Sequence, residues 1–292
     1  MIRIGVDFGG TKIEAAALAR GGEIVARKRV PNPGAYEAAV VAVRDLVRDV
    51  AGGEAHSVGI GIPGSISPRT GLIRNANSVW LNGRPFREDL QVALGQPVRL
   101  ENDANCFALS EACDGAAAGA QVVFGAILGT GCGGGIAVRG QVLGGVNGIA
   151  GEWGHSPLPW PQPHEQSRCW CGRTNCLETW VSGTGFVADY QRATGRKASG
   201  AEIVASRDAD ARAALDRYVD RLGRGLAVIC DILDPDVIVL GGGMSNVAAL
   251  YERLPPIVAA HAFTDVFETG IVRALHGDSS GVRGAAWLWP LE

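Results

Sequence analysis

The sequence predicts an α/β fold, because segments with strand periodicity and segments with helical periodicity are mixed along all 292 residues. A second observation is a weak internal repeat: near residues 2 and 122, a strand, a glycine-rich turn and a further strand follow in the same order. The length is also sufficient for two lobes with separate cores. We therefore expect two lobes that each open with a glycine hairpin.

The first half of the chain contains clear elements. Ile2, Ile4 and Val6 alternate as in a strand, whereas Val40, Val43 and Val47 have helical spacing. The predicted strands cover 2–8, 13–18, 57–62 and 98–100, and the predicted helices cover 37–50 and 104–112.

The second half repeats the opening and then changes character. Strands are expected at 122–128, 136–138 and 236–240, and an amphipathic helix at 215–233. Between them, residues 154–176 contain four prolines, two tryptophans and three cysteines, which indicates an irregular segment.

Composition excludes several classes of protein. The formal net charge of -3 and the pI of about 6.0 argue against nucleic-acid binding, which needs a basic surface. No apolar run approaches the ~18 residues of a membrane span, and residues 1–7 lack a signal-peptide core. Seven cysteines are an odd number for a disulfide framework. We therefore expect a protein of the reducing cytoplasm.

The first glycine turn has the sequence Asp7-Phe8-Gly9-Gly10-Thr11-Lys12. Glycine permits positive φ and lets backbone N–H groups approach an anion, and Asp7 could hold Mg²⁺ directly or through water. The spacing fits neither a P-loop nor a dinucleotide-binding motif. A plain hairpin turn is the alternative.

Two further glycine clusters follow. Residues 129–135 contain five glycines among seven residues, and residues 241–243 are three successive glycines after a strand. Because each glycine costs ~0.5–1 kcal/mol of folding entropy relative to alanine, such clusters indicate space for a ligand. We interpret the two hairpins as a phosphate clamp and the third turn as a support for a nucleotide base and ribose. A flexible hairpin and a tight strand-to-helix turn are the respective alternatives.

Asp103 stands where a helix should begin. Aspartate is a favoured N-cap, so a purely structural role is one interpretation. The other is a general base that accepts the proton of a substrate hydroxyl, for which an ionised carboxylate near a helix N-terminus is suited.

The most specific signal is a cysteine knuckle. Cys169, Cys171 and Cys176 lie within eight residues, and His155 just upstream completes a Cys₃His set typical of structural zinc. His164 is an alternative fourth ligand. The remaining four cysteines are scattered, and we treat them as packing residues.

Two carboxylates flank this knuckle in the sequence. Glu152 precedes it and Glu178 follows it. Paired carboxylate acceptors suit vicinal sugar hydroxyls, and a bound metal would fix both in space. Taken alone, each glutamate fits a solvated surface position better than a ligand site.

Together these segments resemble the ROK family of sugar kinases over nearly the whole chain. Within that family the sequence is similar to the bacterial fructokinase, or manno(fructo)kinase, group. The segments that carry the resemblance are 61–64, 75–83, 102–111, 151–155 and 276–290. The resemblance implies a two-lobed, actin-like (ribonuclease H-like) ATPase fold with a structural zinc knuckle.

The resemblance also implies roles for individual residues. Asp103 matches the catalytic base, and Asn175, where the family often has glycine, tolerates the left-handed conformation. The ATP-binding positions are Asp7, Gly9, Gly10, Thr11, Lys12, Gly129, Thr130, Gly131, Gly133, Gly134, Gly241, Gly242 and Gly243. The sugar-binding positions are Asn102, Asp103, Glu152, His155 and Glu178, with Gly64 and Asn77 as additions. The zinc ligands are His155, Cys169, Cys171 and Cys176.

The implied domains are an N-terminal lobe of residues 1–118, joined by residues 278–292, and a C-terminal lobe of residues 119–277. ATP with Mg²⁺ would lie in the cleft, and the lobes would close over the sugar to exclude water. Family members are often dimers, so we expect a homodimer that binds neither nucleic acid nor membrane.

The implied activity is transfer of the γ-phosphoryl group of ATP to the 6-hydroxyl of D-fructose, with mannose and glucose as side substrates. The similarity at 75–83 and at Trp153 favours fructose. N-acetylglucosamine kinase and then glucokinase or mannokinase are the alternatives. The family also contains transcriptional repressors, which carry a helix-turn-helix ahead of the first strand. Here that strand begins at Ile2, so we expect no such element.

Overall fold

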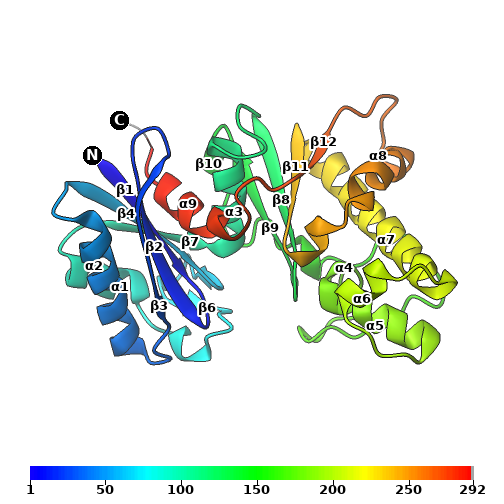
Figure 1. Cartoon of the computed structure of the whole chain (residues 1–292), viewed down its shortest axis with the longest axis horizontal. Coiled ribbons are helices and arrows are strands. Elements are labelled where there is room, and N and C mark those ends of the chain that lie inside the picture. Colours follow the sequence, from blue (N-terminus) through cyan, green and yellow to red (C-terminus); the bar gives the residue numbers. More distant parts are fainter. Residues whose placement is uncertain (291–292) are drawn as a thin grey trace. The chain divides into compact units, whose positions relative to one another are not determined.

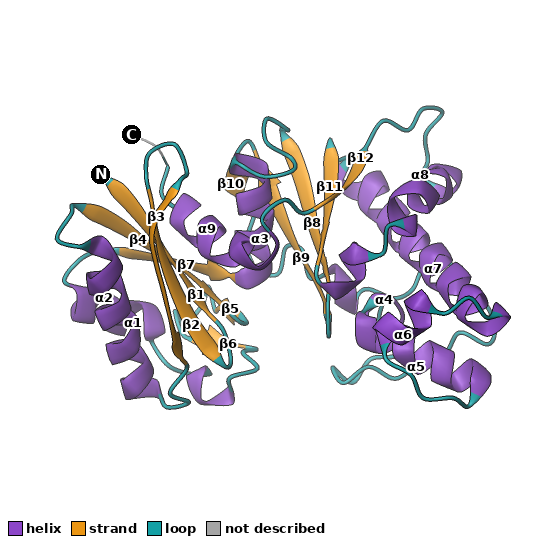
Figure 2. Cartoon of the chain, in the orientation of Figure 1, coloured by secondary structure: helices purple, strands orange, loops and turns teal. Residues whose placement is uncertain are grey.

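The computed structural model describes residues 1–290, with Asp278 described for its backbone alone. Helices and strands are mixed along the chain, which confirms the α/β class (Figure 2). The chain divides into two compact units. Unit 1 comprises residues 1–119, 135–150 and the described residues from 276 onward, and unit 2 comprises residues 120–134 and 151–275. The predicted C-terminal segment 278–292 ends in Leu291 and Glu292, which lie outside the described residues.

Unit 1 contains one five-stranded sheet with the order β3-β2-β1-β4-β7. β1 pairs antiparallel with β2, which confirms the predicted hairpin, and parallel with β4. The elements are β1 (Ile2–Phe8), β2 (Lys12–Leu18), β3 (Ile24–Pro31), α1 (Tyr36–Ala51), β4 (His56–Ile62), β5 (Ser65–Ile66), β6 (Ile73–Arg74), α2 (Phe86–Leu94), β7 (Val98–Asn102), α3 (Asp103–Cys113), β10 (Gln141–Val142) and α9 (Ser280–Trp287). A 3₁₀ helix covers Val79–Leu81.

Helices cover both faces of this sheet. Alternate residues of β2 serve the two faces: Ala15 and Ala17 join the large core beneath α1 and α2, whereas Ala16 and Leu18 pack with Val282 of α9. In Figure 1, α1 and α2 accordingly lie on one side of the sheet, and α9 and α3 lie on the other. The ends of β1 and β7 are thereby fixed between two layers.

Three glycines allow α9 to lie unusually close to its neighbours. A Cβ atom at Gly5 in β1 would collide with the Val282 carbonyl oxygen. One at Gly284 would collide with the Cys106 carbonyl oxygen of α3, and Gly59 in β4 has the same constraint against α9. The helix is therefore in backbone contact with the sheet on one side and with α3 on the other.

Unit 2 is built on the sheet β10-β9-β8-β11-β12. β8 pairs parallel with β11, and β11 pairs parallel with β12. β9 begins in unit 2 and continues into unit 1 after Gly134. The elements are β8 (Val122–Leu128), β9 (Cys132–Val138), α4 (Glu178–Val181), α5 (Gly183–Thr194), α6 (Gly200–Ala205), α7 (Ala209–Leu233), β11 (Val237–Gly241), α8 (Ala249–His261) and β12 (Gly270–Arg273). Short 3₁₀ helices cover Trp153–His155 (η2) and Gly243–Asn246 (η3).

Helix α7 is longer than its sequence pattern predicts. It begins at Ala209 rather than near Leu215, because the Asp208 side chain caps it by accepting a hydrogen bond from Ala211 N. The additional turn buries Ala211 and Ala214, whose small side chains give a weak periodic signal. Among residues 1–290, no helix is both long enough and apolar enough to cross a membrane.

Candidate active site

Asp103 is the first residue of α3, directly after β7. The N-cap is Asn102, whose Oδ1 accepts from Ala104 N at 2.9 Å, whereas the Asp103 side chain is exposed. Asp103 Oδ1 also accepts from Ala104 N, at 2.8 Å. The Asp103 carboxyl group therefore lies exposed at a helix N-terminus, where the helix dipole favours negative charge.

Asp7 is the penultimate residue of β1 in the same unit. Burial, followed by the negative charges of Asp103 and Glu14, raises the pKa of its carboxyl group to about 6. The carboxylate lies against Gly281 in the first turn of α9, where an added Cβ would be 3.2 Å from Asp7 Cγ. Two neighbouring carboxylates, one of them mostly buried, favour a cation such as Mg²⁺ at this position.

The turn after β1 leaves its backbone accessible. Gly9 N donates to Lys12 O at 3.0 Å, and the Asn32 side chain donates to Gly9 O at 2.7 Å. Neither Gly9 nor Gly10 has a positive φ, so the expected conformational reason for these glycines is wrong. Gly10 and Thr11 are exposed, and a Cβ at Gly10 would meet no atom closer than 3.8 Å, whereas one at Gly9 would be 3.0 Å from Lys12 O.

The glycine cluster of unit 2 combines open positions with packed ones. Gly129 N donates to Gly131 O at 3.1 Å to close the turn, and no atom lies within 4 Å of a Cβ added at Gly129. At Gly134, by contrast, such a Cβ would be 2.6 Å from the Trp153 ring. Part of the glycine excess therefore reflects packing rather than ligand space.

The third glycine turn lies beside the second. Gly242 has φ of 79°, and a Cβ there would be 2.6 Å from the Leu128 carbonyl carbon and 2.8 Å from Gly129 N. Gly243 opens the 3₁₀ helix η3, and α8 starts only at Ala249. Two of the predicted nucleotide-binding segments are thus neighbours within unit 2.

The four predicted zinc ligands converge. His155, Cys169, Cys171 and Cys176 offer ligand atoms that all lie within 4.8 Å of one another, and we call them the metal-ligand cluster. His164, the alternative ligand, is exposed and is not among them.

The spacing of these atoms fits a tetrahedral ion. Cys171 Sγ and Cys176 Sγ are 3.6 Å apart, and Cys169 Sγ and His155 Nδ1 are 3.8 Å apart. Zn–S bonds of about 2.3 Å place tetrahedral sulfur ligands about 3.8 Å from one another. All three cysteines are free thiols.

Burial and the neighbouring thiols raise the pKa of Cys176 to about 12, whereas a hydrogen bond from the Arg173 backbone lowers the pKa of Cys171. The donor set suits structural zinc, which would hold three thiolates and one imidazole together.

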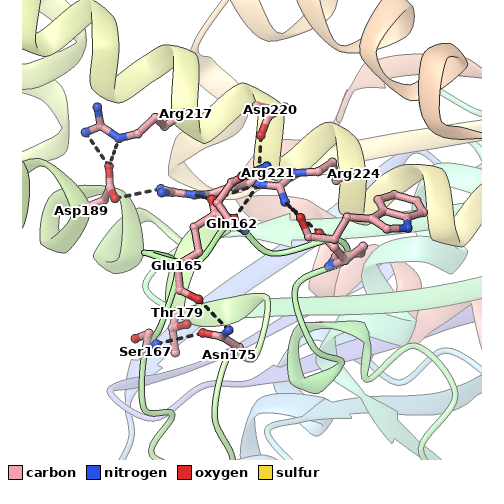
Figure 3. A network of polar contacts seen from close by, with 12 residues as sticks. Gln162, Glu165, Ser167, Asn175, Thr179, Asp189, Arg217, Asp220, Arg221 and Arg224 are labelled. Carbon is pink, nitrogen blue, oxygen red and sulfur yellow. Dashed lines mark hydrogen bonds and ion pairs between the residues drawn. The ribbon is translucent and has the colours of Figure 1, made fainter.

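A buried ion-pair network anchors the metal loop, residues 156–177, to helices α5 and α7 (Figure 3). Glu165 Oε1 accepts from Arg221 Nε at 2.6 Å and from Arg224 Nη2 at 3.0 Å. Arg221 Nη1 also forms an ion pair with Asp189 Oδ1 at 2.8 Å. Burial opposes ionisation of Glu165, but hydrogen bonds from Arg221, Gln162 N and Arg224 outweigh it and lower its pKa. Breaking one partner of such a buried pair is strongly destabilising.

Asn175 joins this network to the metal loop. Its φ of 59° lies in the left-handed region, which we expected asparagine to tolerate at this position. Its Oδ1 accepts from Ser167 N at 2.9 Å, and its Nδ2 donates to Glu165 O at 2.7 Å. The amide therefore fixes the loop just before Cys176.

The predicted sugar-binding residues are divided between the units. In unit 1, Asn102 Nδ2 donates to Gly64 O at 2.8 Å, and Asn77 is exposed in the loop after β6. Gly64 has a φ of 77° and no space for a Cβ, which explains why this position is glycine. In unit 2, Glu152 is exposed, whereas both carboxylate oxygens of Glu178 have hydrogen-bond partners.

Several contributing residues carry no sequence signal that we used. Asn32 holds the first glycine turn, Asn82 pins Ala76 through two hydrogen bonds, and Thr184 holds Thr130 O at 2.7 Å. Trp170 could have been noticed, because a tryptophan between two metal-ligating cysteines is an unusual choice for an exposed loop.

The model of the ROK family matches residues 3–292. The N-acetyl-D-glucosamine kinases of Shigella boydii and Vibrio cholerae are each 41% identical to this chain, over 97% of this chain and 98% of those relatives. The expected fructokinase assignment is therefore not supported, and the alternative, N-acetylglucosamine kinase, is favoured. Sequence motifs shared by the whole family carry too little information about the sugar to separate the two.

Solved structures agree with this family. The ROK hexokinase of Thermus thermophilus has a TM-score of 0.88 and 32% identity, covering 99% of this chain and 97% of its own. A ROK glucokinase of Streptomyces griseus in complex with glucose and AMPPNP has a TM-score of 0.77 and 28% identity, covering 98% of each chain. A ROK transcriptional regulator at 21% identity shares the fold alone. This chain thus belongs to the ROK family and has the two-lobed, actin-like α/β fold of its sugar kinases.

Proposed function

We propose that this protein is an ATP-dependent N-acetylglucosamine kinase, which transfers the γ-phosphoryl group to the 6-hydroxyl of the sugar. One observation carries the choice of sugar: the 41% identity to N-acetyl-D-glucosamine kinases extends over 97% of the chain. A hexokinase and a glucokinase of the same fold support sugar phosphorylation as the reaction class.

In this proposal Asp103 is the general base. Its exposed carboxylate at the start of α3 accepts the proton of the 6-hydroxyl and orients that oxygen toward the γ-phosphorus. Phosphoryl transfer has a loose transition state, so alignment of the hydroxyl contributes more than strong deprotonation.

The glycine turns are proposed to hold ATP. In unit 1, the backbone of Gly9–Lys12 faces the phosphates, and Asp7 holds the Mg²⁺ that accompanies them. In unit 2, the adjacent turns at 129–134 and 241–243 hold phosphate oxygens and the adenosine. The Mg²⁺ ion neutralises charge that develops on the β- and γ-phosphate oxygens.

Each unit, taken by itself, contains residues that are proposed to bind the sugar. Unit 1 supplies Asn102 and Asp103, with Gly64 and Asn77 beside them, and unit 2 supplies Glu152, His155 and Glu178. His155 is proposed to serve both the metal and the sugar: its Nδ1 lies 3.8 Å from Cys169 Sγ, and Nε2 is the atom proposed to bind a hydroxyl. A zinc ion held by His155 and the three cysteines would fix the position of this histidine.

The test is ADP release coupled to a reporter reaction, with Mg-ATP and a panel of N-acetylglucosamine, N-acetylmannosamine, glucose, mannose and fructose. We expect kcat/KM for N-acetylglucosamine to exceed that for fructose by at least about tenfold, because a site that binds the amide is left with unpaired polar groups by sugars that lack it. The 6-deoxy analogue is the control and should release no ADP. A higher kcat/KM for fructose or glucose would refute the assignment.

A further inference from the structure

Three hydrogen bonds hold the turn at residues 129–132, and all three come from the segment directly after the metal loop. They run from Cys132 N to Glu178 Oε2 (3.0 Å), from Gly183 N to Gly129 O (2.7 Å) and from Thr184 Oγ1 to Thr130 O (2.7 Å). The start of α4 and the start of α5 therefore support the backbone of this turn from one side.

The side chain of Glu178 joins the turn to the metal loop. Its Oε2 accepts from Cys132 N, and its Oε1 accepts from Trp170 Nε1 at 2.6 Å. The Trp170 side chain is 79% exposed and is oriented by this bond and by an edge-to-face contact with His155, with ring centroids 5.2 Å apart. One carboxylate thus bridges the turn and a residue that lies between two metal ligands in the sequence.

The fourth member of the metal-ligand cluster, His155, lies in η2, and this 3₁₀ helix contacts the same stretch of backbone. In that 3₁₀ helix Trp153 Nε1 donates to Gly133 O at 2.8 Å, and Gly154 is packed against the Cys132 carbonyl oxygen so closely that a Cβ would collide. Because the metal-ligand cluster joins η2 to the loop before α4, an ion there would tie together both supports of the turn.

We propose that Glu178 is a positioning residue that couples the metal-ligand cluster to the turn at 129–132, so that bound metal increases the affinity for nucleotide phosphates. This inference rests on the proposed function, in which the turn holds those phosphates. Glycine-rich backbone loses much conformational entropy when it is ordered by a ligand, and a turn that is already held in place loses less. By linkage, the nucleotide must increase the affinity for the metal by the same factor.

The test compares the zinc-loaded and the chelator-treated full chain, as wild type and as Glu178→Gln. The affinity for Mg-ADP is measured by calorimetry without sugar, so that a role of Glu178 in sugar binding does not enter. We expect chelation to weaken Mg-ADP binding to the wild type by roughly five- to tenfold, the size of one or two net hydrogen bonds.

In Glu178→Gln the effect of chelation should fall below about twofold, because an amide cannot accept from both Cys132 N and the Trp170 indole. An equally large effect in the variant would exclude Glu178 as the link. No effect in the wild type would overturn the coupling itself.

Two further variants substitute residues of the metal loop and leave the Glu178 side chain itself unchanged. Trp170→Phe keeps a ring beside His155 but removes the N–H donor, so we expect unchanged zinc content and a similarly reduced response to chelation. Thr174→Ala, an exposed position in the same loop, is the matched control and should respond like the wild type. A wild-type response in Trp170→Phe would contradict the proposed route.

Hydrogen exchange separates this inference from the proposed function. Removal of zinc should accelerate amide exchange in residues 129–134 of the wild type without any nucleotide, but cause little further change in Glu178→Gln. If exchange responds to zinc and no Mg-ADP binds, the nucleotide role fails while the link between metal and turn stands. If Mg-ADP binds but neither exchange nor affinity depends on zinc, the inference fails and the proposed function stands.

Discussion

At the scale of single residues, the division of labour at the start of α3 is the central feature. Asn102 is the N-cap, and the Asp103 side chain is exposed although it also accepts from Ala104 N. The proposed catalytic role thus falls on the residue directly after the cap. This separation lets the two roles be tested independently.

We expect Asp103→Asn to lower kcat by roughly 10²–10⁴-fold, the usual contribution of a general base, because an amide cannot accept the hydroxyl proton. The melting temperature and the Mg-ADP affinity should stay near the wild-type values, since Asn102 remains as the cap. Steady-state kinetics and calorimetry measure these quantities. Turnover above about a tenth of the wild-type value would remove Asp103 as the base.

Asp7 makes a pH-dependent contribution to stability. Its folded pKa of about 6 lies above the ordinary value of 3.8. The folded state therefore holds a proton that the unfolded state has lost, and stability falls as pH rises between about 4 and 6. Above pH 6 the ionised carboxylate costs up to about 3 kcal/mol.

Asp7→Asn should therefore raise the melting temperature at pH 8 and change it little at pH 4.5, where the wild-type carboxyl is protonated in the folded state. Thermal unfolding without Mg²⁺ at the two pH values measures the difference. A change in melting temperature of equal size at both pH values would show that the charge of Asp7 is not its cause.

At the scale of elements, the packing of α9 depends on three glycines, two in neighbouring strands and one in the helix itself. Gly5 and Gly59 lie in the sheet and Gly284 lies in the helix, and each removes a Cβ that would meet backbone rather than a movable side chain. Because backbone cannot move aside cheaply, this contact tolerates no enlargement.

We expect Gly284→Ala to lower the free energy of unfolding by roughly 1–3 kcal/mol or more, the usual cost of overpacking. Gly144→Ala in the same unit is the control, since its Cβ would meet only Glu101 Oε2, at 3.9 Å. Thermal unfolding of both variants measures the difference. Equal stability of the two would mean that α9 can shift away from α3.

At the scale of the whole molecule, the metal-ligand cluster lies at a long segment that has little regular structure of its own. The ion-pair network joins Glu165 of the metal loop to α7, and three of the four members of the cluster lie in the same loop. Among its described residues, unit 1 has no such cluster.

We expect Cys171→Ser to lose most of its zinc and to weaken sugar binding, because three ligands cannot close a tetrahedral site. Cys113→Ala, outside the cluster, is the control and should retain its metal. Elemental analysis gives the zinc content, and calorimetry gives the sugar affinity. Full zinc content in Cys171→Ser would refute the site.

Local sequence signals predicted two kinds of feature. These are the elements whose apolar residues recur at a regular spacing and the metal ligands that share a short segment. The alternation in β1 and the spacing of Cys169, Cys171 and Cys176 are examples, because strand pleat and metal coordination both act over a few residues. β3 was not predicted, because it is a largely exposed edge strand with Arg27, Lys28 and Arg29 in its middle.

Long-range contacts decided the rest. The hydrogen bond from Asn102 to Gly64 O, the backbone contact of α9, and the bridge from Trp170 through Glu178 to Cys132 depend on contacts between separate segments of the chain. Periodicity and spacing cannot report such contacts, because their geometry exists only once separate elements have packed together.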